Sequence, residues 1–169
     1  MSLAWKFCPV CAAPLGRKEM GGLPRAHCPQ CGALYFENSK PCVGALIERD
    51  GKLLLGERNR DPFKGWWDII GGFLENGEDP EVGVLREARE ETGLDVEPVG
   101  LLGAWVDAYG DTGIYGLNLY YRCRVIGGAE AAADDVSRLK WWPIDALPPI
   151  AFPHTVHVVE ALRKAPRLL

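Results

Sequence analysis

The sequence predicts a mixed α/β sandwich that is preceded by a small cysteine-rich unit. Two C-x-x-C pairs lie within the first 31 residues of the 169-residue chain. Apolar runs of strand length follow them and are interleaved with two segments of helical pattern. Because strands and helices alternate rather than segregate, we expect the body of the chain to form a sheet covered by helices.

The composition is that of a globular protein, with 47% hydrophobic and 25% charged residues. No apolar run approaches the roughly 18 residues that a membrane span needs, and the N-terminus lacks the apolar core of a secretory signal. These features predict a cytoplasmic protein with no membrane partner.

Charge is distributed unevenly along the chain. Residues 1–40 carry a net charge of +3, which leaves −7 for the remainder of a chain whose total is −4. Binding to a nucleic-acid backbone rests on clustered Lys and Arg. The acidic body therefore argues against nucleic acid as the main partner.

The cysteine-rich unit, residues 1–38, is predicted to be a zinc ribbon. Its two hooks are Cys8-Pro9-Val10-Cys11 and Cys28-Pro29-Gln30-Cys31, and Gly32 follows the second hook. A two-residue spacer lets both sulfur atoms of a hook point at one centre, so two hooks complete a tetrahedral thiolate shell.

Other interpretations of the four cysteines explain less. Disulfides need an oxidising compartment, and a single redox pair would not account for a second hook. Iron in the same thiolate shell stays open. Four thiolates leave no coordination position for a substrate, so we expect Zn²⁺ to have a structural role.

The body, residues 39–169, begins with two apolar runs joined by Arg49-Asp50-Gly51, which is a hairpin signal. Aromatic and branched residues indicate further strands before and after a predicted helix. The predicted strands are Pro41–Glu48, Lys52–Arg58, Val96–Val106, Tyr115–Ile126 and Leu139–Trp142, and an amphipathic C-terminal helix is predicted over Pro153–Ala165.

The first helix is predicted over Pro80–Thr92. Asp79 is a good N-cap, proline suits the first helical position, and Gly93 suits the left-handed residue after the end. At about 100° per residue, the core face contains Val82, Leu85, Ala88 and Thr92.

Three carboxylates, those of Glu87, Glu90 and Glu91, share the other face of this helix, and those of Glu90 and Glu91 are expected to face solvent without metal. Gly83 lies in the middle of that face, where it weakens a helix by roughly 1 kcal/mol relative to Ala. A close approach there would explain the glycine. An ordinary solvated helix stays open, since Arg86 can pair with Glu90. Hard divalent cations suit the carboxylates.

The stretch resembles the Nudix box: Gly72, five residues, Glu78, seven residues, and then Arg86-Glu87-Ala88-Arg89-Glu90-Glu91-Thr92-Gly93-Leu94. The resemblance extends over about residues 41–165, including Lys64-Gly65-Trp66-Trp67 and Trp141-Trp142-Pro143. Ile70 departs from the pattern, because many members have Pro before the glycine pair.

The resemblance implies a Nudix α/β/α sandwich that hydrolyses a nucleoside diphosphate linked to a second group X. It also implies a catalytic Mg²⁺ (or Mn²⁺). The ligands would be Glu87, Glu90, Glu91 and the Gly72 carbonyl, while Arg86 would orient Glu87 and Glu78 would brace the loop.

The general base is expected to be Glu87 or Glu90. Asp134 and Asp135 are alternatives, although two Asp residues in an Ala-rich loop are better explained by solubility. Arg58 is a weak candidate for phosphate contact, and Trp67 and Phe73 are weak candidates for stacking a base.

The order of ribbon and catalytic domain is similar to that of NADH pyrophosphatases. Their downstream Ser-Gln-Pro-Trp-Pro-Phe-Pro-like stretch has no nearer counterpart here than Ala151-Phe152-Pro153-His154. ADP-ribose, NADH or a related dinucleotide is the expected nucleotide-type substrate. A MutT-type nucleoside triphosphate pyrophosphohydrolase and a non-catalytic binding module are the alternatives. By resemblance, a homodimer is expected.

Overall fold

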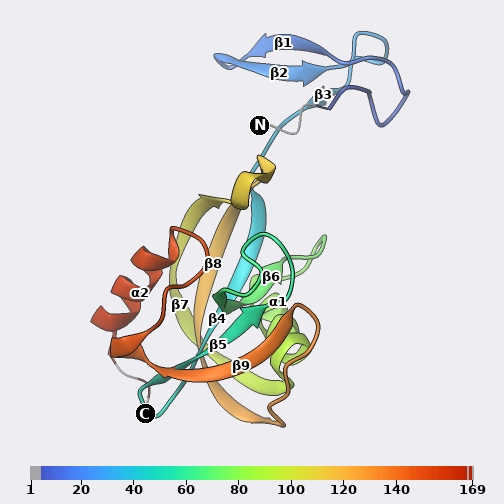
Figure 1. Ribbon diagram of the computed structural model, residues 1–169. Coiled ribbons are helices and arrows are strands. Elements are labelled where there is room, and N and C mark those ends of the chain that lie inside the picture. Colours follow the sequence, from blue (N-terminus) through green and yellow to red (C-terminus); the bar gives the residue numbers. More distant parts are fainter. Residues whose placement is uncertain (1–4, 167, 169) are drawn as a thin grey trace.

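A computed structural model describes residues 5–166 and residue 168, and it contains two separate sheets (Figure 1). The small sheet is antiparallel and consists of β1 (Gly16–Met20), β2 (Leu23–His27) and β3 (Leu34–Tyr35). It lies apart from the body, which it reaches through residues 36–39 (Figure 1). The division of the chain between residues 38 and 39 stays a prediction.

The large sheet has six strands in the order β7-β8-β4-β6-β5-β9. Two α-helices and two short 3-10 helices accompany it, and none of the helices that the structure describes has the length and apolar character needed to cross a bilayer. The bounds are β4 (Lys40–Arg49), β5 (Lys52–Arg58), β6 (Trp67–Phe73), α1 (Pro80–Thr92), β7 (Leu94–Ala108), η1 (Gly110–Thr112), β8 (Tyr115–Gly128), β9 (Val136–Pro143), η2 (Ile144–Ala146) and α2 (Thr155–Lys164).

The predicted hairpin between β4 and β5 is confirmed. Glu48 pairs with Leu53 and Arg49 with Lys52. Asp50 and Gly51 have φ values of 51° and 71°, so both adopt the left-handed conformation that a tight two-residue hairpin turn requires. The turn residues of the sequence therefore determine where β4 ends.

Strand β4 is the central strand of the large sheet. It runs parallel to β8 from Lys40↔Gly116 to Glu48↔Arg124 and antiparallel to β6 from Cys42↔Phe73 to Ala45↔Ile70. Every residue from 42 to 48 is buried, which agrees with the nearly continuous apolar run in the sequence.

The two faces of the sheet carry separate hydrophobic cores. Val84 and Ala88 of α1 pack on one face, whereas Val158 and Leu162 of α2 pack on the other. A helix thus covers each face, and the predicted α/β/α sandwich is confirmed.

Gly71 lets β6 pass closely beside β4. Its φ is 151°, and a Cβ atom at this position would lie 2.1 Å from the carbonyl oxygen of Val43. No larger residue fits without separating the strands. This close pairing places Gly72 and the loop that follows it directly in front of α1.

Candidate active site

A cavity of about 440 Å³ lies where α1 and β6 meet the ends of β7 and β8. This volume falls in the range of small-molecule binding sites. The ionisable acidic and basic residues of its lining are Arg58, Arg60, Asp68, Glu75, Arg86, Glu87, Glu90, Glu91, Asp107, Asp134, Asp135 and His154. Of the predicted catalytic residues, all except Glu78 line the cavity.

The ends of α1 are where the capping residues predicted them. Asp79 Oδ1 accepts a hydrogen bond of 3.1 Å from the backbone N–H of Glu81. Gly93 is left-handed with φ of 69°, and its N–H bonds to the carbonyl of Arg89. The helix therefore presents a fixed run of carboxylates to the cavity.

The predicted core face of α1 is partly wrong. Val82 and Leu85 are 54% and 40% exposed, whereas Glu87 and Glu91 are only 8% and 5% exposed. The core contact is made by Val84 and Ala88. Because the cavity lies beside the face of the helix that contacts β6, the two glutamates point toward the cavity, and a projection that sorts residues by polarity cannot reveal this.

The close approach predicted at Gly83 comes from the protein's own loop. A Cβ atom there would lie 2.3 Å from Leu74 Cδ2 and 3.2 Å from Glu78 Oε2. The glycine therefore lets the loop between β6 and α1 lie flat against the helix.

Arg86 joins the loop to the carboxylates. Its Nε and Nη2 donate to the two oxygens of Glu78 at 2.8 and 2.9 Å, and its Nη1 donates to Glu87 Oε1 at 2.8 Å and Glu90 Oε2 at 3.0 Å. Nη2 also donates to the Phe73 carbonyl at 3.2 Å. These bonds lower the pKa of Glu78 to about 2. A planar five-donor guanidinium is required for such a set of contacts.

Burial disfavours the charged form of the two inward-pointing glutamates. Burial raises the pKa of Glu91 to about 8 and also raises the pKa of Glu87. Glu91 Oε2 accepts a bond of 2.9 Å from the N–H of Gly71. The expectation that the carboxylate faces solvent is therefore wrong for Glu91, whereas the side chain of Glu90 is 47% exposed.

Oxygen donors of this kind suit a hard divalent cation. A bound cation would stabilise the charged forms of Glu87 and Glu91 and so lower the pKa values that burial raises. In the described residues the three glutamate carboxylates do not converge to within 4.8 Å of one another, and Arg86 Nη1 donates to both Glu87 and Glu90. The donor set fits in chemistry, and the ligand assignment stays a prediction.

The predicted substrate contacts differ in where they lie. Phe73 lines the cavity and is 41% exposed. Arg58 also lines it, but its guanidinium bonds to Asp68 Oδ2 at 2.8 Å and to the Pro62 carbonyl at 2.7 Å. Trp67 is absent from the lining and packs beside Trp142 in the core under α2.

Asp134 and Asp135 both line the cavity, and a role for either as general base stays a prediction. Arg60 forms ion pairs with both of them. Asn59 binds the carbonyl of Asp134 at 2.7 Å. The loop before β9 is thus tied to the loop after β5.

Among the lining residues that the sequence analysis did not single out are Asp107, Tyr120, Phe152 and His154. Two of them stand in Ala151-Phe152-Pro153-His154, which was noted only for its motif. The combination of an aromatic residue with a histidine just before a helix was the available signal. Their partners lie far away in sequence, so their contacts were not visible there.

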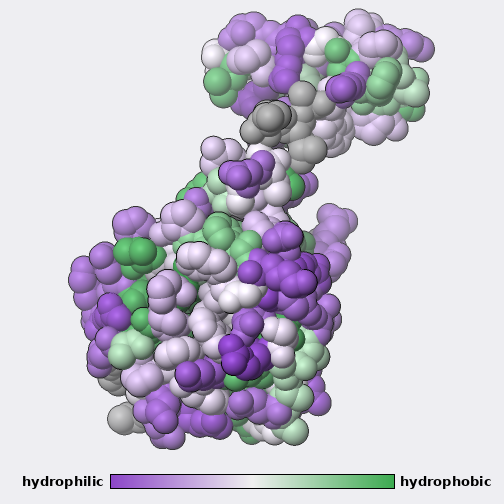
Figure 2. All heavy atoms as spheres, in the orientation of Figure 1, coloured by the Kyte–Doolittle hydropathy of each residue, from purple (hydrophilic) through white to green (hydrophobic). Residues whose placement is uncertain are grey.

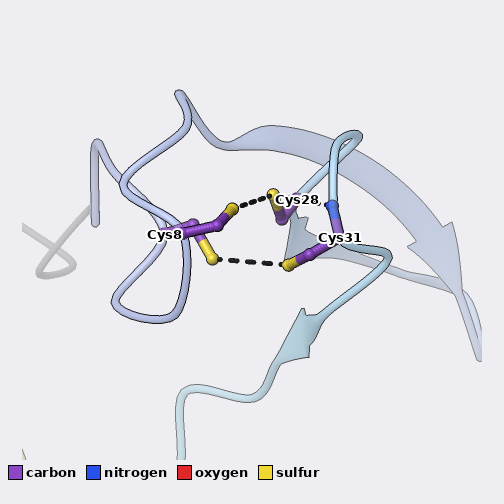
Figure 3. A group of neighbouring side chains, drawn as sticks. Cys8, Cys28 and Cys31 are labelled. Carbon is purple, nitrogen blue, oxygen red and sulfur yellow. Dashed lines mark hydrogen bonds between the residues drawn. The ribbon is translucent and has the colours of Figure 1, made fainter.

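The four-cysteine cluster is the second candidate site (Figure 3). The four sulfur atoms lie within 4.8 Å of one another, and the Cys8–Cys31 and Cys11–Cys28 distances are 3.6 and 3.5 Å. These separations are too long for disulfides and suit a tetrahedral thiolate shell. The cysteines are accordingly free.

Both hooks have the same backbone geometry. The N–H of Cys8 bonds to the carbonyl of Ala13, and the N–H of Cys28 bonds to that of Ala33, each at 2.8 Å. The residue that follows each hook, Ala12 or Gly32, has a left-handed backbone conformation. Two equivalent turns thus present their sulfur atoms to one centre, and the Tyr35 hydroxyl lies 3.0 Å from Cys8 Sγ.

Comparison with known proteins agrees with this geometry. A model of the NUDIX domain matches residues 38–162. An ADP-ribose pyrophosphatase of Methanocaldococcus jannaschii is 36% identical over 121 residues, which are 72% of each chain. A NUDIX hydrolase from Nitrosomonas europaea has a similar structure, with a TM-score of 0.80 and 26% identity over 95% of this chain and 89% of that one.

A further relative shares the ribbon region as well. The NAD-capped RNA hydrolase NudC of Vibrio atlanticus is 29% identical over 173 residues, or 98% of this chain and 61% of that protein. That relative is named for an RNA substrate. The exclusion of nucleic acid from charge balance alone is therefore unsupported.

The family model covers most of the chain, and the large sheet, the Arg86-centred loop and the carboxylates of α1 all lie inside the matched residues. The chain therefore belongs to the NUDIX family of pyrophosphohydrolases, which act on phosphoanhydride bonds.

Proposed function

We propose that the protein is a divalent-metal-dependent pyrophosphatase that cleaves a nucleoside diphosphate linked to a second group. ADP-ribose is the first substrate, and NADH or a related dinucleotide is the second. One observation carries the proposal. At one wall of the cavity, the guanidinium of Arg86 bonds to Glu78, Glu87 and Glu90, and the buried Glu91 lies beside them.

Each residue of this wall has a distinct task in the proposal. Glu87, Glu90, Glu91 and the Gly72 carbonyl hold Mg²⁺ or Mn²⁺, which when bound neutralises the diphosphate and lowers the pKa of a water. Arg86 orients Glu87 and Glu90, and the Gly71 N–H orients Glu91. Either Glu87 or Glu90 accepts the proton of the attacking water.

The similarity to the Methanocaldococcus jannaschii protein supports ADP-ribose as substrate. The similarity to NudC supports an adenine dinucleotide as the next candidate. For the ribbon we propose a structural Zn²⁺, because four thiolates leave no open coordination position.

The experiment incubates the full chain and Mg²⁺ with ADP-ribose, NADH, an NAD-capped RNA and a set of nucleoside triphosphates. We expect AMP and ribose 5-phosphate from ADP-ribose, identified by phosphorus NMR. Nucleoside monophosphate and pyrophosphate from triphosphates alone would favour the MutT-type alternative. Binding of a nucleotide without any cleavage would show a binding module and defeat the proposal.

Matched substitutions locate the reaction. Glu90→Gln is expected to lower kcat by about a hundredfold or more, since the exposed side chain is a ligand or base. Glu160→Gln on the exposed side of α2 changes the same chemical group far from the cavity and should keep full activity. Full activity of Glu87→Gln, Glu90→Gln and Glu91→Gln would remove these residues from the site.

A further inference from the structure

Three residues outside α1 form a buried hydrogen-bonded chain beside the cavity. His154 Nδ1 lies 3.0 Å from Asp107 Oδ2, and His154 Nε2 lies 2.6 Å from the hydroxyl of Tyr120. A carboxylate can only accept, so Nδ1 carries the proton and the Tyr120 hydroxyl donates to Nε2. His154 and Tyr120 are 7% and 6% exposed. The chain therefore joins β7, β8 and the segment before α2.

This chain fixes the backbone on one side of Phe152. Asp107 Oδ2 also accepts a bond of 3.0 Å from the N–H of His154, so one carboxylate holds both ring and main chain. On the other side, the N–H of Ala151 bonds to the Trp67 carbonyl at 2.8 Å. The carbonyl of Phe152 accepts a bond of 2.7 Å from the hydroxyl of Thr155.

Phe152 needs these restraints because its φ is 67°. The left-handed conformation is unfavourable for a residue with a Cβ atom, and such residues persist only where the surroundings fix them. They are frequent at ligand-binding sites. This backbone conformation sets the direction of the Phe152 ring, which lines the cavity.

The ring of Phe152 belongs to an aromatic wall of the cavity. It stacks on Tyr109, with a centroid distance of 5.5 Å and an interplanar angle of 24°. Arg58 lies over the Phe152 ring at 5.1 Å, and Phe73 lies 5.5 Å from Tyr109. One lining therefore combines the carboxylates of α1 with rigid aromatic surface.

We propose that Asp107, Tyr120 and His154 are positioning residues, and that the wall they hold, formed by Phe152 and Tyr109, receives the nucleobase. The diphosphate then lies at the carboxylates of α1, so the inference rests on the proposed function. Planar aromatic side chains bind bases of any sequence by stacking, which suits a wall that offers rings rather than a set of base-specific polar groups.

The test compares two phosphate monoesters that differ by the base, namely AMP and ribose 5-phosphate. Their Kd values are measured by calorimetry with the full chain. We expect Phe152→Leu to weaken AMP binding by about tenfold, the size of one lost stacking contact, and to leave ribose 5-phosphate unchanged. Tyr120→Phe removes the hydroxyl that orients His154, and we expect a smaller loss of about threefold with the same selectivity for AMP.

Two controls match these substitutions. Phe36→Leu changes an exposed ring on the ribbon side of the chain, and Tyr115→Phe removes a hydroxyl from an exposed tyrosine. Both should bind AMP as the wild type does. If Tyr120→Phe fails to fold by circular dichroism, the half-buried Phe152 decides the question alone.

Several outcomes would overturn the inference. Equal losses for both ligands in Phe152→Leu, no loss for AMP, or a wild-type protein that binds both ligands equally would each do so. Binding requires no turnover, so AMP binding that depends on Phe152 in a protein that cleaves no diphosphate would defeat only the proposed function. Hydrolysis with AMP binding that is independent of Phe152 would defeat only this inference.

Discussion

At the scale of single residues, the buried carboxyl of Glu91 lowers the stability of the metal-free fold, and a substitution can measure by how much. Its carboxylate is almost completely buried, and its pKa is raised to about 8. Glu91→Gln keeps an oxygen for the Gly71 N–H and removes the buried ionisable group. Without metal, we expect the variant to be more stable by about 1 kcal/mol, or a Tm higher by about 2–4 °C.

Thermal unfolding in EDTA and in Mg²⁺ checks this prediction. Mg²⁺ should raise the Tm of the wild type and not that of Glu91→Gln, because a ligand that binds only the folded state stabilises it. Glu90→Gln is the control, since an exposed carboxylate should give no gain in EDTA. A lower Tm of metal-free Glu91→Gln would contradict the assignment.

His154 makes stability depend on pH in a defined direction. Burial lowers its pKa from the ordinary 6.5, although the bond to Asp107 acts in the opposite direction. Folding therefore releases protons from this residue, and its contribution is complete above about pH 6.5 and is lost as the pH falls toward the folded value. Asp107, Tyr120 and the nearby His157 are the groups that surround it.

Urea unfolding at several pH values between 5 and 8 measures the effect. Between pH 7 and pH 5, the wild type should lose more free energy of unfolding than His154→Gln does. His157→Gln, at an exposed position of α2, should keep the wild-type slope. Parallel curves for the wild type and His154→Gln would show that His154 is not held neutral.

The residues of the box could be located from the sequence, because a fixed spacing on one helix determines their neighbours. The resemblance paired Arg86 with Glu87, and Arg86 Nη1 donates to Glu87 Oε1 at 2.8 Å. Phe152 and His154 could not be located, since their positions depend on Trp67 and Asp107, which lie on distant strands.

At the scale of elements, the packing of β6 against α1 depends on Gly72. A Cβ atom there would lie 2.5 Å from Glu87 Oε1. Gly72→Ala should displace this carboxylate and lower kcat by about tenfold to a hundredfold, because small misplacements at a reacting centre are costly. Its φ lies outside the left-handed region, and the obstructing group is the end of a side chain, so the fold should persist.

Gly100→Ala is the matched control for this prediction. A Cβ atom at Gly100 would meet no heavy atom within 4 Å. Steady-state kinetics of both variants, with circular dichroism for folding, separates the two outcomes. Unchanged kcat in Gly72→Ala would show that Glu87 tolerates displacement.

The bounds of elements were predicted better than their orientation. The capping residues Asp79 and Gly93 place the ends of α1, because caps act locally. Which face of α1 is buried depends on the cavity beside it. A helix usually buries its apolar side, whereas here Glu87 and Glu91 are buried beside a polar cavity. Val82 is predicted to lie on the core face because it is apolar, but it is exposed.

At the scale of the molecule, we expect the four-cysteine unit to need zinc for its folding, whereas the large sheet should fold without it. Elemental analysis is expected to find about one zinc per chain, and Cys8→Ser should lose it. Limited proteolysis of this variant should then cut within residues 5–39 and leave the large sheet intact, because the small sheet lies apart from the body (Figure 2) and every residue of β1 is exposed.

Cys123→Ser is the control, since Cys123 is buried in the core beside β4 and lies outside the cluster. It should retain the wild-type zinc content even if it lowers stability. A folded, protease-resistant ribbon without metal would contradict the structural role of zinc.

The parallel pairing of β4 with β8 has a consequence for synthesis of the chain. The central strand cannot complete its hydrogen bonding until residues 116–124 have left the ribosome, although α1 and its carboxylates appear much earlier. Contacts of such long sequence separation form late and slowly. We therefore expect the nascent protein to acquire its four-cysteine unit first and its hydrolytic competence only near the end of translation.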